Sequence, residues 1–253
     1  MNVFVTGASS GIGAALAREY ARRGARLGLV ARRRAMLDEL VASLPGTHHC
    51  YAVDVTDRDA LIAAARDFEA ASGGTDIVIA NAGISMGVLT EFYEDLESFG
   101  EVLKTNVLSL AYTFHPFIAP MRKRRSGKLV GIASVAGIRG LPGSEAYCAS
   151  KAAAISYLEC LRVELQRDGI SVLTIAPGFV RTPLTARNPY PMPFLMDADK
   201  FARAAADAVA AGRTYAVIPW QMGVLAKVLR ALPNWLYDRV MARRPYKPRK
   251  QSA

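Results

Sequence analysis

The chain has 253 residues, of which 51% are hydrophobic, 8% aromatic and 21% charged, a composition that supplies a buried core and excludes a disordered or fibrous protein. Lys and Arg number 32 against 22 Asp and Glu, giving a net charge of +10 that favours anionic partners without naming one. Cys50, Cys148 and Cys160 are odd in number and form no CxxC pair, which argues against a disulfide framework and a structural zinc site.

Short, continuous apolar runs recur along the chain and predict strands that are buried on both faces. They cover residues 3–5, 27–30, 77–80, 129–133, 172–176 and 216–218. Helix-length segments lie between them, among them residues 14–23, 60–71 and 152–167, and Gly24 and Gly169 stand where a helix would end. This alternation predicts an α/β fold with a doubly wound parallel sheet and helices on both faces. We expect one catalytic domain over residues 1–220 and a C-terminal extension over residues 221–253.

A glycine-rich loop joins the first predicted strand to the first predicted helix. It reads Thr6-Gly7-Ala8-Ser9-Ser10-Gly11-Ile12-Gly13, and no Lys-Ser or Lys-Thr pair follows it, which excludes a nucleoside-triphosphate P-loop. Glycines in this place permit a tight turn and let backbone N–H groups approach a pyrophosphate at the positive end of the helix. The alternative is a glycine-rich turn that binds nothing.

The second predicted strand ends in a run of arginines. Where an acidic residue would bind the ribose 2′-hydroxyl of NAD(H), this chain has Ala31 followed by Arg32, Arg33 and Arg34. A guanidinium there can form paired hydrogen bonds to a 2′-phosphate, so we expect NADP(H) to be preferred, with NAD(H) as the alternative. The expectation rests on Arg32, because Arg33 and Arg34 fit the solvated start of a helix.

A tyrosine and a lysine stand four residues apart at the start of another predicted helix. Tyr147 and Lys151 therefore share one helical face, and Ser134 directly follows the strand at 129–133, at the edge of the sheet where ligands bind. An ammonium near a phenol favours the phenolate, so we expect Lys151 to lower the pKa of Tyr147 toward the range of proton transfer at neutral pH.

With these motifs in order, the sequence resembles the short-chain dehydrogenase/reductase family, in its branch of roughly 250 residues. The resemblance covers residues 2 to about 218. The motifs that carry it are Thr6-Gly7-x-x-x-Gly11-x-Gly13, Asp54-Val55, Asn81-Ala82-Gly83, Asn106 within Lys-Thr-Asn-Val, Ser134, Tyr147-x-x-x-Lys151 and Pro177-Gly178-Phe179-Val180-Arg181-Thr182. The sequence departs from the family at Ala80, where relatives often have a second Asn, and at Ser10, where some NADP-dependent relatives carry a basic residue.

The resemblance implies a Rossmann-like sheet of about seven strands and a set of site residues. Tyr147 would be the general acid/base, Ser134 would hold the substrate oxygen, Lys151 would bind the nicotinamide ribose, and Asn106 would support a proton-relay water. The cofactor would be contacted by Gly7, Ser9, Ser10, Gly11, Ile12, Gly13, Arg32, Asp54, Val55, Asn81, Ala82, Gly83, Tyr147, Lys151, Pro177, Gly178, Val180 and Thr182. Relatives commonly pair through helices into homodimers or homotetramers.

These features together predict an NADP(H)-dependent oxidoreductase that interconverts a carbonyl and a secondary alcohol. The apolar, Pro- and Met-rich stretch at residues 184–196 predicts a lid over an apolar or lipid-like substrate, although the same residues could pack on the domain. The alternatives are a dinucleotide-binding sensor without turnover, 3-oxoacyl reduction and epimerisation. Scattered carboxylates have no ligand spacing, so we expect no metal.

The C-terminal extension is amphipathic and basic. Residues 222–232 are apolar except for Lys227 and Arg230, Pro233 interrupts, and Asn234 can cap a second segment over residues 235–244. Six of the twelve residues from Arg239 to Lys250 are basic and none is acidic, a pattern that would suit peripheral binding to an anionic membrane. The alternative is that the apolar faces pack on the domain or on a second subunit while the basic end is solvated.

The sequence also predicts where the protein resides. It contains no run of 18 apolar residues, and the glycine motif begins at Gly7, so we expect a cytoplasmic protein that could lie against the inner face of a membrane. The basic stretch Arg122-Lys123-Arg124-Arg125 is expected to form an exposed turn, and because no aromatic residues are interleaved with it we expect no nucleic-acid binding.

Overall fold

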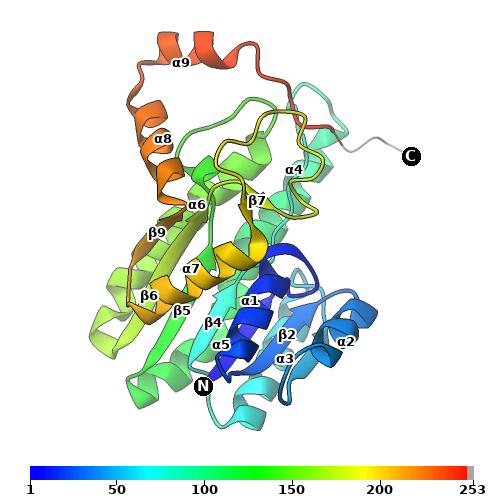
Figure 1. Ribbon diagram of the computed structural model, residues 1–253, viewed down its shortest axis with the longest axis vertical. Coiled ribbons are helices and arrows are strands. Elements are labelled where there is room, and N and C mark those ends of the chain that lie inside the picture. The colour runs from blue at the N-terminus through cyan, green and yellow to red at the C-terminus, as the bar shows by residue number, and fades with distance from the viewer. Residues whose placement is uncertain (250–253) are drawn as a thin grey trace.

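The computed structural model describes residues 1–249, and a seven-stranded sheet lies at its centre (Figure 1). All neighbouring strands are parallel, and their order is β3-β2-β1-β4-β5-β6-β9. The strands are β1 (Asn2–Thr6), β2 (Arg26–Ala31), β3 (His49–Ala52), β4 (Ile77–Ala80), β5 (Gly127–Ile132), β6 (Ile170–Pro177) and β9 (Tyr215–Ile218). Two short strands, β7 (Val180–Arg181) and β8 (Met196–Asp197), pair separately. The predicted α/β, Rossmann-like fold is confirmed.

Helices connect the strands and cover both faces of the sheet. They are α1 (Gly11–Arg22), α2 (Arg34–Ala42), α3 (Arg58–Ser72), α4 (Asp95–Leu103), α5 (Ser109–Arg124), α6 (Glu145–Leu165), α7 (Ala198–Ala210), α8 (Trp220–Ala231) and α9 (Asn234–Met241). The expected turn at residues 122–125 is wrong, because Arg122, Lys123 and Arg124 form the last helical turn of α5. Arg125 alone leaves the helix, with a φ of 52°.

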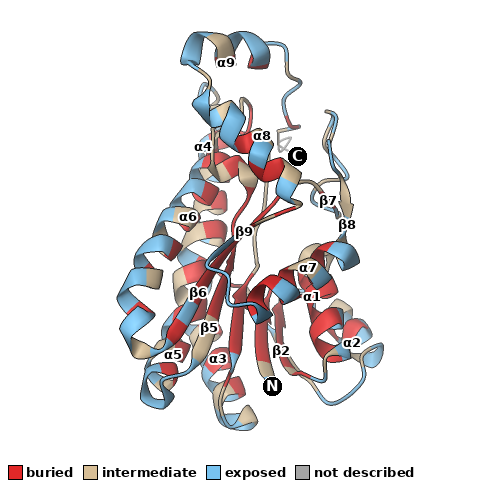
Figure 2. Ribbon diagram, turned by 60° about the vertical axis from the view of Figure 1, so that its left-hand side comes forward, coloured by how far each residue is buried: buried red, intermediate tan, exposed pale blue. Residues whose placement is uncertain are grey.

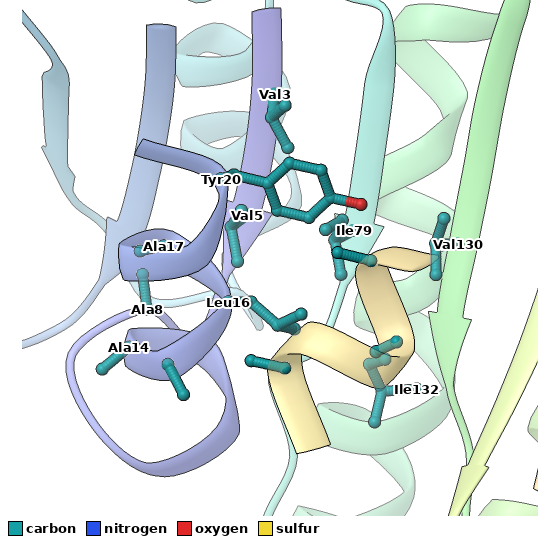
Figure 3. Close-up of a cluster of buried hydrophobic side chains, with 14 of the residues drawn as sticks. Val3, Val5, Ala8, Ala14, Leu16, Ala17, Tyr20, Ile79, Val130 and Ile132 are labelled. Carbon is teal, nitrogen blue, oxygen red and sulfur yellow. The ribbon is translucent and has the colours of Figure 1, made fainter. Parts of the chain in front are cut away.

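The sheet has a separate apolar core on each face. On one face α1, α2 and α7 pack on the strands, and Figure 3 shows Leu16 and Tyr20 of α1 against Val3 and Val5 of β1. On the other face α3, α5 and α6 enclose a core that includes the ring of Phe4. Figure 2 shows that the strands are buried almost throughout. Burial on both faces explains why these strands read as continuous apolar runs.

The topology leaves a crevice at the carboxyl ends of the strands. β2 lies on one side of β1 and β4 lies on the other, so the order of the strands reverses beside β1. The helices that leave these strands pack on opposite faces of the sheet, which separates their N-terminal ends. The glycine loop follows β1, Arg32 follows β2 and Asn81 follows β4, so these three motifs lie beside the reversal.

The C-terminal extension crosses from one side of the molecule to the other. In Figure 1 the chain runs from α9 over the carboxyl edge of the sheet and reaches the start of α4 at Arg249. Pro233 occupies the N-cap position of α9, so the expected cap at Asn234 is wrong, and the helix ends at Met241 rather than at residue 244. Asn234 instead accepts a hydrogen bond from Arg139.

The extension packs on the domain through part of its apolar surface. Met222 and Ala226 of α8 and Tyr237 and Met241 of α9 are buried. The expectation of a fully solvated basic end is wrong, because Lys247 is buried as well; Lys250 lies outside the described residues. Within residues 1–249, no helix has the length and hydrophobicity needed to span a bilayer.

Candidate active site

A cleft of about 1000 Å³ lies at the carboxyl ends of the strands and brings the sequence motifs together. It is lined by Gly7, Ser9, Ser10, Gly11, Ile12, Arg32, Asp54, Val55, Asn81, Ala82, Gly83, Ser134, Tyr147, Lys151, Pro177, Gly178, Val180 and Thr182. Of the predicted catalytic and cofactor-binding residues, Gly13 and Asn106 do not line it. The volume is at the upper end of the range of small-molecule and cofactor sites.

The glycine loop forms the floor of one end of the cleft. Gly7 has a φ of 69°, a conformation that side chains disfavour, and a Cβ there would lie 2.8 Å from the backbone of Ala82. A Cβ on Gly13 would lie 2.2 Å from the carbonyl oxygen of Gly7. These contacts explain why the loop needs glycine, and they hold the N-terminus of α1 against the cleft.

The N-terminus of α1 suits an anion. Ser10 occupies the N-cap position without a side-chain capping hydrogen bond, and the first turn contains no acidic residue. The N–H groups of the first helical turn have no partner within the helix, and the helix dipole makes this end positive. The pyrophosphate of a dinucleotide therefore fits the donors that this loop presents.

Asn81 joins the end of β4 to the glycine loop. Its side-chain amide donates hydrogen bonds to the carbonyl oxygens of Thr6 (2.9 Å) and Gly7 (3.3 Å), and its backbone N–H donates to the hydroxyl of Thr6 (3.1 Å). The residue thus lines the cleft and also fixes the loop that forms the cleft's floor.

The arginines after β2 line the cleft beside the glycine loop. Arg32 is exposed and its guanidinium lies 3.8 Å from the carboxylate of Asp54. Burial opposes ionisation of Asp54, but hydrogen bonds from Thr56 and the charges of Arg32 and Lys104 hold its pKa below the usual value. Asp54 is therefore a carboxylate at neutral pH.

Arg33 is exposed at the N-cap of α2, as interpreted from the sequence, but it also contacts the glycine loop. Its guanidinium turns back over the glycine loop and donates hydrogen bonds to the hydroxyls of Ser9 (3.2 Å) and Ser10 (3.4 Å). Arg34 does match that interpretation, because it is exposed and bonded to Asp38 one turn along α2. Arg32, Arg33 and the hydroxyls of Ser9 and Ser10 thus line the same part of the cleft, and the sequence pointed to only one of the arginines.

Ser134, Tyr147 and Lys151 meet at the other end of the cleft. Ser134 follows β5 and caps a short 3₁₀ turn, where its hydroxyl accepts a hydrogen bond from the N–H of Ala136 (3.1 Å). Tyr147 and Lys151 lie one turn apart near the start of α6, with the ammonium of Lys151 5.8 Å from the centre of the Tyr147 ring. The hydroxyl of Ser134 lies near the phenol of Tyr147 and favours its ionised form.

The expected acidification of Tyr147 by Lys151 is wrong for this structure. Burial raises the pKa of Tyr147 to about 12, and the nearby Ser134 hydroxyl offsets only part of the rise. Burial also lowers the pKa of Lys151 to about 8. The Lys151 ammonium donates a hydrogen bond to the carbonyl oxygen of Ile132 (2.8 Å). Tyr147 is thus a protonated phenol at neutral pH.

Asn106 lies behind the cleft in a π-helical turn between α4 and α5. Its side chain is buried, accepts a hydrogen bond from the N–H of Ile84 (2.8 Å), and donates to the carbonyl oxygen of Ile84 (3.0 Å) and the hydroxyl of Ser150 (2.9 Å). Both amide hydrogens are thus used. The side chain ties the loop after β4 to α6, the helix that carries Tyr147 and Lys151.

The opening of the cleft includes residues from the C-terminal extension that sequence reasoning missed. Lys247, Pro248 and Arg249 line it, opposite Leu184 and Arg187 of the predicted lid segment. No local pattern could have revealed this, because the contacts of Lys247 are with Ser85 and Leu184, far away along the chain.

Comparison with known proteins places the chain among oxidoreductases. Residues 1–191 match the family model described as short chain dehydrogenase. An uncharacterized oxidoreductase of Myxococcus xanthus is 40% identical over 92% of this chain and 93% of its own length. A crystal structure of a short-chain dehydrogenase from Streptomyces avermitilis superposes with a TM-score of 0.79 at 29% identity, covering 94% of this chain and 97% of that one.

A further solved structure has a nucleotide bound. It is an alcohol dehydrogenase from the archaeon Thermococcus sibiricus complexed with 5-hydroxy-NADP, with a TM-score of 0.76 at 25% identity. The alignment covers 85% of this chain and 94% of that one.

Proposed function

Because the chain belongs to the short-chain dehydrogenase family of NAD(P)-dependent oxidoreductases, we propose that it reduces a carbonyl group of an apolar or lipid-like substrate with NADPH. The observation that carries the proposal is the grouping of Ser134, Tyr147 and Lys151 at one end of a cleft whose other end presents an uncapped helix N-terminus and two arginines. Residues 1–220 would form the catalytic domain, and residues 221–253 an extension that completes the opening of the cleft.

The proposed chemistry assigns a role to each of the three side chains. The bound nicotinamide supplies a hydride to the carbonyl carbon. Ser134 holds the carbonyl oxygen by a hydrogen bond, and Tyr147 donates its phenolic proton to that oxygen as negative charge develops. The buried ammonium of Lys151 lies beside the Tyr147 ring, where its positive charge stabilises the phenolate left behind. Alcohol oxidation is the reverse, with the Tyr147 phenolate as the base.

The preference for NADP(H) over NAD(H) is proposed to depend on Arg32 and Arg33. Since two guanidiniums and the hydroxyls of Ser9 and Ser10 gather at one end of the cleft, a 2′-phosphate would receive several charge-assisted hydrogen bonds. The test is nucleotide oxidation monitored with ketones of graded chain length, using NADPH and then NADH. We expect turnover with NADPH, and Arg33→Ala should raise the KM for NADPH about 10- to 100-fold while changing the KM for NADH little.

Arg34→Ala is the matched control, because this arginine is bonded to Asp38 and does not line the cleft. Its KM values should equal those of the wild type. Turnover with no ketone would contradict the proposed function, whereas equal losses with the two nucleotides would contradict only the phosphate site.

The exposed apolar residues support further proposals about partners. We propose that copies of the chain pair through α5 and α6, because Leu108 just before α5 is 47% exposed and Val163 of α6 is 62% exposed. We also propose that the protein works in the cytoplasm. On α8, Trp220, Val224 and Val228 follow one another at four-residue spacing and are all more than half exposed, as is Trp235 on α9. This stripe, with the cations Lys227, Arg230, Arg239 and Arg243 beside it, favours contact with an anionic lipid surface.

The expected result for the lipid proposal is that the full chain co-sediments with vesicles containing anionic lipid. Replacing both exposed tryptophans, as Trp220→Ser and Trp235→Ser, should abolish this, whereas Tyr93→Ser should not, because Tyr93 is 87% exposed but lies outside the stripe. Point variants are preferable to a truncation before Met222, which would also remove Lys247 from the cleft. A full chain that does not co-sediment would contradict lipid binding, and equal co-sedimentation of all three proteins would contradict the role of the two tryptophans.

A further inference from the structure

The C-terminal extension is fastened across the opening of the cleft by a complete set of interactions at Arg249. Its guanidinium donates to Asp95 (2.7 Å) and Glu94 (2.9 Å) and lies 3.5 Å from the centre of the Phe92 ring. The N–H of Gly87 donates to the carbonyl oxygen of Pro248 (3.0 Å). Arg249 therefore has two carboxylates for its one charge, and the extension is anchored without any help from its neighbour Lys247.

Among residues 1–249, no carboxylate is paired with the charge of Lys247 in the way that Asp95 and Glu94 are paired with Arg249. It is only 8% exposed, and its ammonium donates to the hydroxyl of Ser85 at 2.9 Å and, at the limit of hydrogen bonding, to the carbonyl oxygen of Leu184 at 3.5 Å. Within residues 1–249, no carboxylate lies close enough to pair with it. Burial alone lowers the pKa of Lys247 to about 8, which leaves the amine mostly charged at neutral pH. Buried charges in proteins are ordinarily paired, so this ammonium is short of a counter-ion.

The position of Lys247 shows where a counter-ion would come from. Ser85 follows β4 on one side of the cleft and Leu184 follows β7 on the other, so the ammonium bridges the two sides of the opening. Both partners line the same cleft as Ser134 and Tyr147. The exposed Arg187 also lines this opening, and the acidic lining residues are Asp54, near Arg32, and Glu101 on α4.

We propose that Lys247 binds an anionic group of the substrate, so that the protein acts on a carbonyl compound with a carboxylate on an otherwise apolar body. A carboxylate there would supply the missing charge and accept the hydrogen bond that the distant Leu184 carbonyl accepts only weakly. The apolar side chains of Ile84, Met86 and Leu184 line the same part of the cleft and would contact the rest of the molecule. This inference rests on the proposed function and narrows its substrate class.

The test compares keto acids with their methyl esters, which differ in charge. The series has one to six methylene groups between the ketone and the carboxylate, and kcat/KM is measured with NADPH at pH 7 for wild type and for Lys247→Met. We expect the wild type to prefer the acid at one or more chain lengths. Lys247→Met should lower kcat/KM for that acid about 10- to 100-fold through KM and change the value for its ester less than threefold.

Two controls separate charge recognition from closure of the opening. Lys227→Met removes an exposed lysine of α8 that does not line the cleft, and it should leave kcat/KM for acid and ester unchanged. Arg249→Gln loosens the anchor but keeps the Lys247 charge, so acid and ester should fall together. The Kd for NADPH should be the same in Lys247→Met and wild type, because an altered Kd would mean that the ammonium serves a cofactor phosphate and would overturn the proposal.

A binding measurement distinguishes failure of this inference from failure of the proposed function. Isothermal titration of the same keto acids into the full chain with NADP⁺ present does not require turnover. Binding of acids but not esters, lost in Lys247→Met, would support the anion site even if no compound in the series were reduced. Acids and esters that bind and react alike in both proteins, or an equal loss of both in Lys247→Met, would overturn it.

Discussion

Lys151→Met is expected to make the protein more stable and nearly inactive. The ammonium is buried, and its pKa falls from an ordinary value of 10.5 to about 8, so holding the charge in place at pH 7 costs about 3 kcal/mol at roughly 1.4 kcal/mol per pKa unit. Methionine fills a similar volume without charge. Loss of the hydrogen bond to the Ile132 carbonyl destabilises the variant by about 1 kcal/mol. The free energy of unfolding therefore rises by a net amount of about 2 kcal/mol, and Tm rises by several degrees.

The size of this stability difference depends on pH between the two pKa values of Lys151. Below pH 8 the amine is charged in both the folded and the unfolded chain, so the full cost applies to the wild type. Between pH 8 and 10.5 the folded chain releases its proton first, and wild-type stability rises relative to the variant. The advantage of Lys151→Met should therefore be constant up to pH 8 and shrink above it.

Calorimetry from pH 7 to 10 together with turnover assays checks both parts of this prediction. Activity should fall at least about 100-fold, the usual scale for a group that tunes acid–base catalysis. Lys128→Met is the control, because Lys128 also donates to a backbone carbonyl, that of Val209, but lies away from the cleft. It should keep activity and gain no stability. A Lys151→Met protein less stable than wild type at pH 7 would refute the argument.

The sequence predicted the sheet and most of the site because both depend on local patterns. Six of the seven strands are continuous apolar runs, a pattern imposed by burial on both faces. β3 is not such a run: His49 and Tyr51 stand in an edge strand that is only partly buried, so its composition resembles that of a loop. The glycine loop and the Tyr147–Lys151 pair depend on spacings within one turn or one helix, which a sequence records directly.

Features that depend on contacts between residues far apart in the chain could not be predicted from the sequence. Arg33 and Arg34 have identical side chains, and only the turn before α2 directs the first to the glycine loop and the second to Asp38. Lys247 reads as one cation in a basic tail until the extension crosses the cleft and buries it. The pKa of Tyr147 went the opposite way from expectation because helical spacing reveals a nearby charge but not the burial that outweighs it.

The central claim, that Tyr147 is the proton donor, is tested most directly by Tyr147→Phe. The substitution removes only the phenolic hydroxyl, which lies near Ser134 in the cleft. The glycine loop and the arginines that would bind the nucleotide are untouched. NADPH affinity should therefore stay within about threefold of wild type while kcat falls by at least about 100-fold, the usual contribution of general acid catalysis.

Tyr157→Phe provides the matched control, because Tyr157 lies further along the same helix and does not line the cleft. The decisive measurement is single-turnover NADPH oxidation by wild type, Tyr147→Phe and Tyr157→Phe with the same ketone at pH 7. If Tyr147 is the proton donor, only Tyr147→Phe should lose the reaction, with its nucleotide still bound. Wild-type rates in Tyr147→Phe would contradict the assignment of Tyr147 as the proton donor.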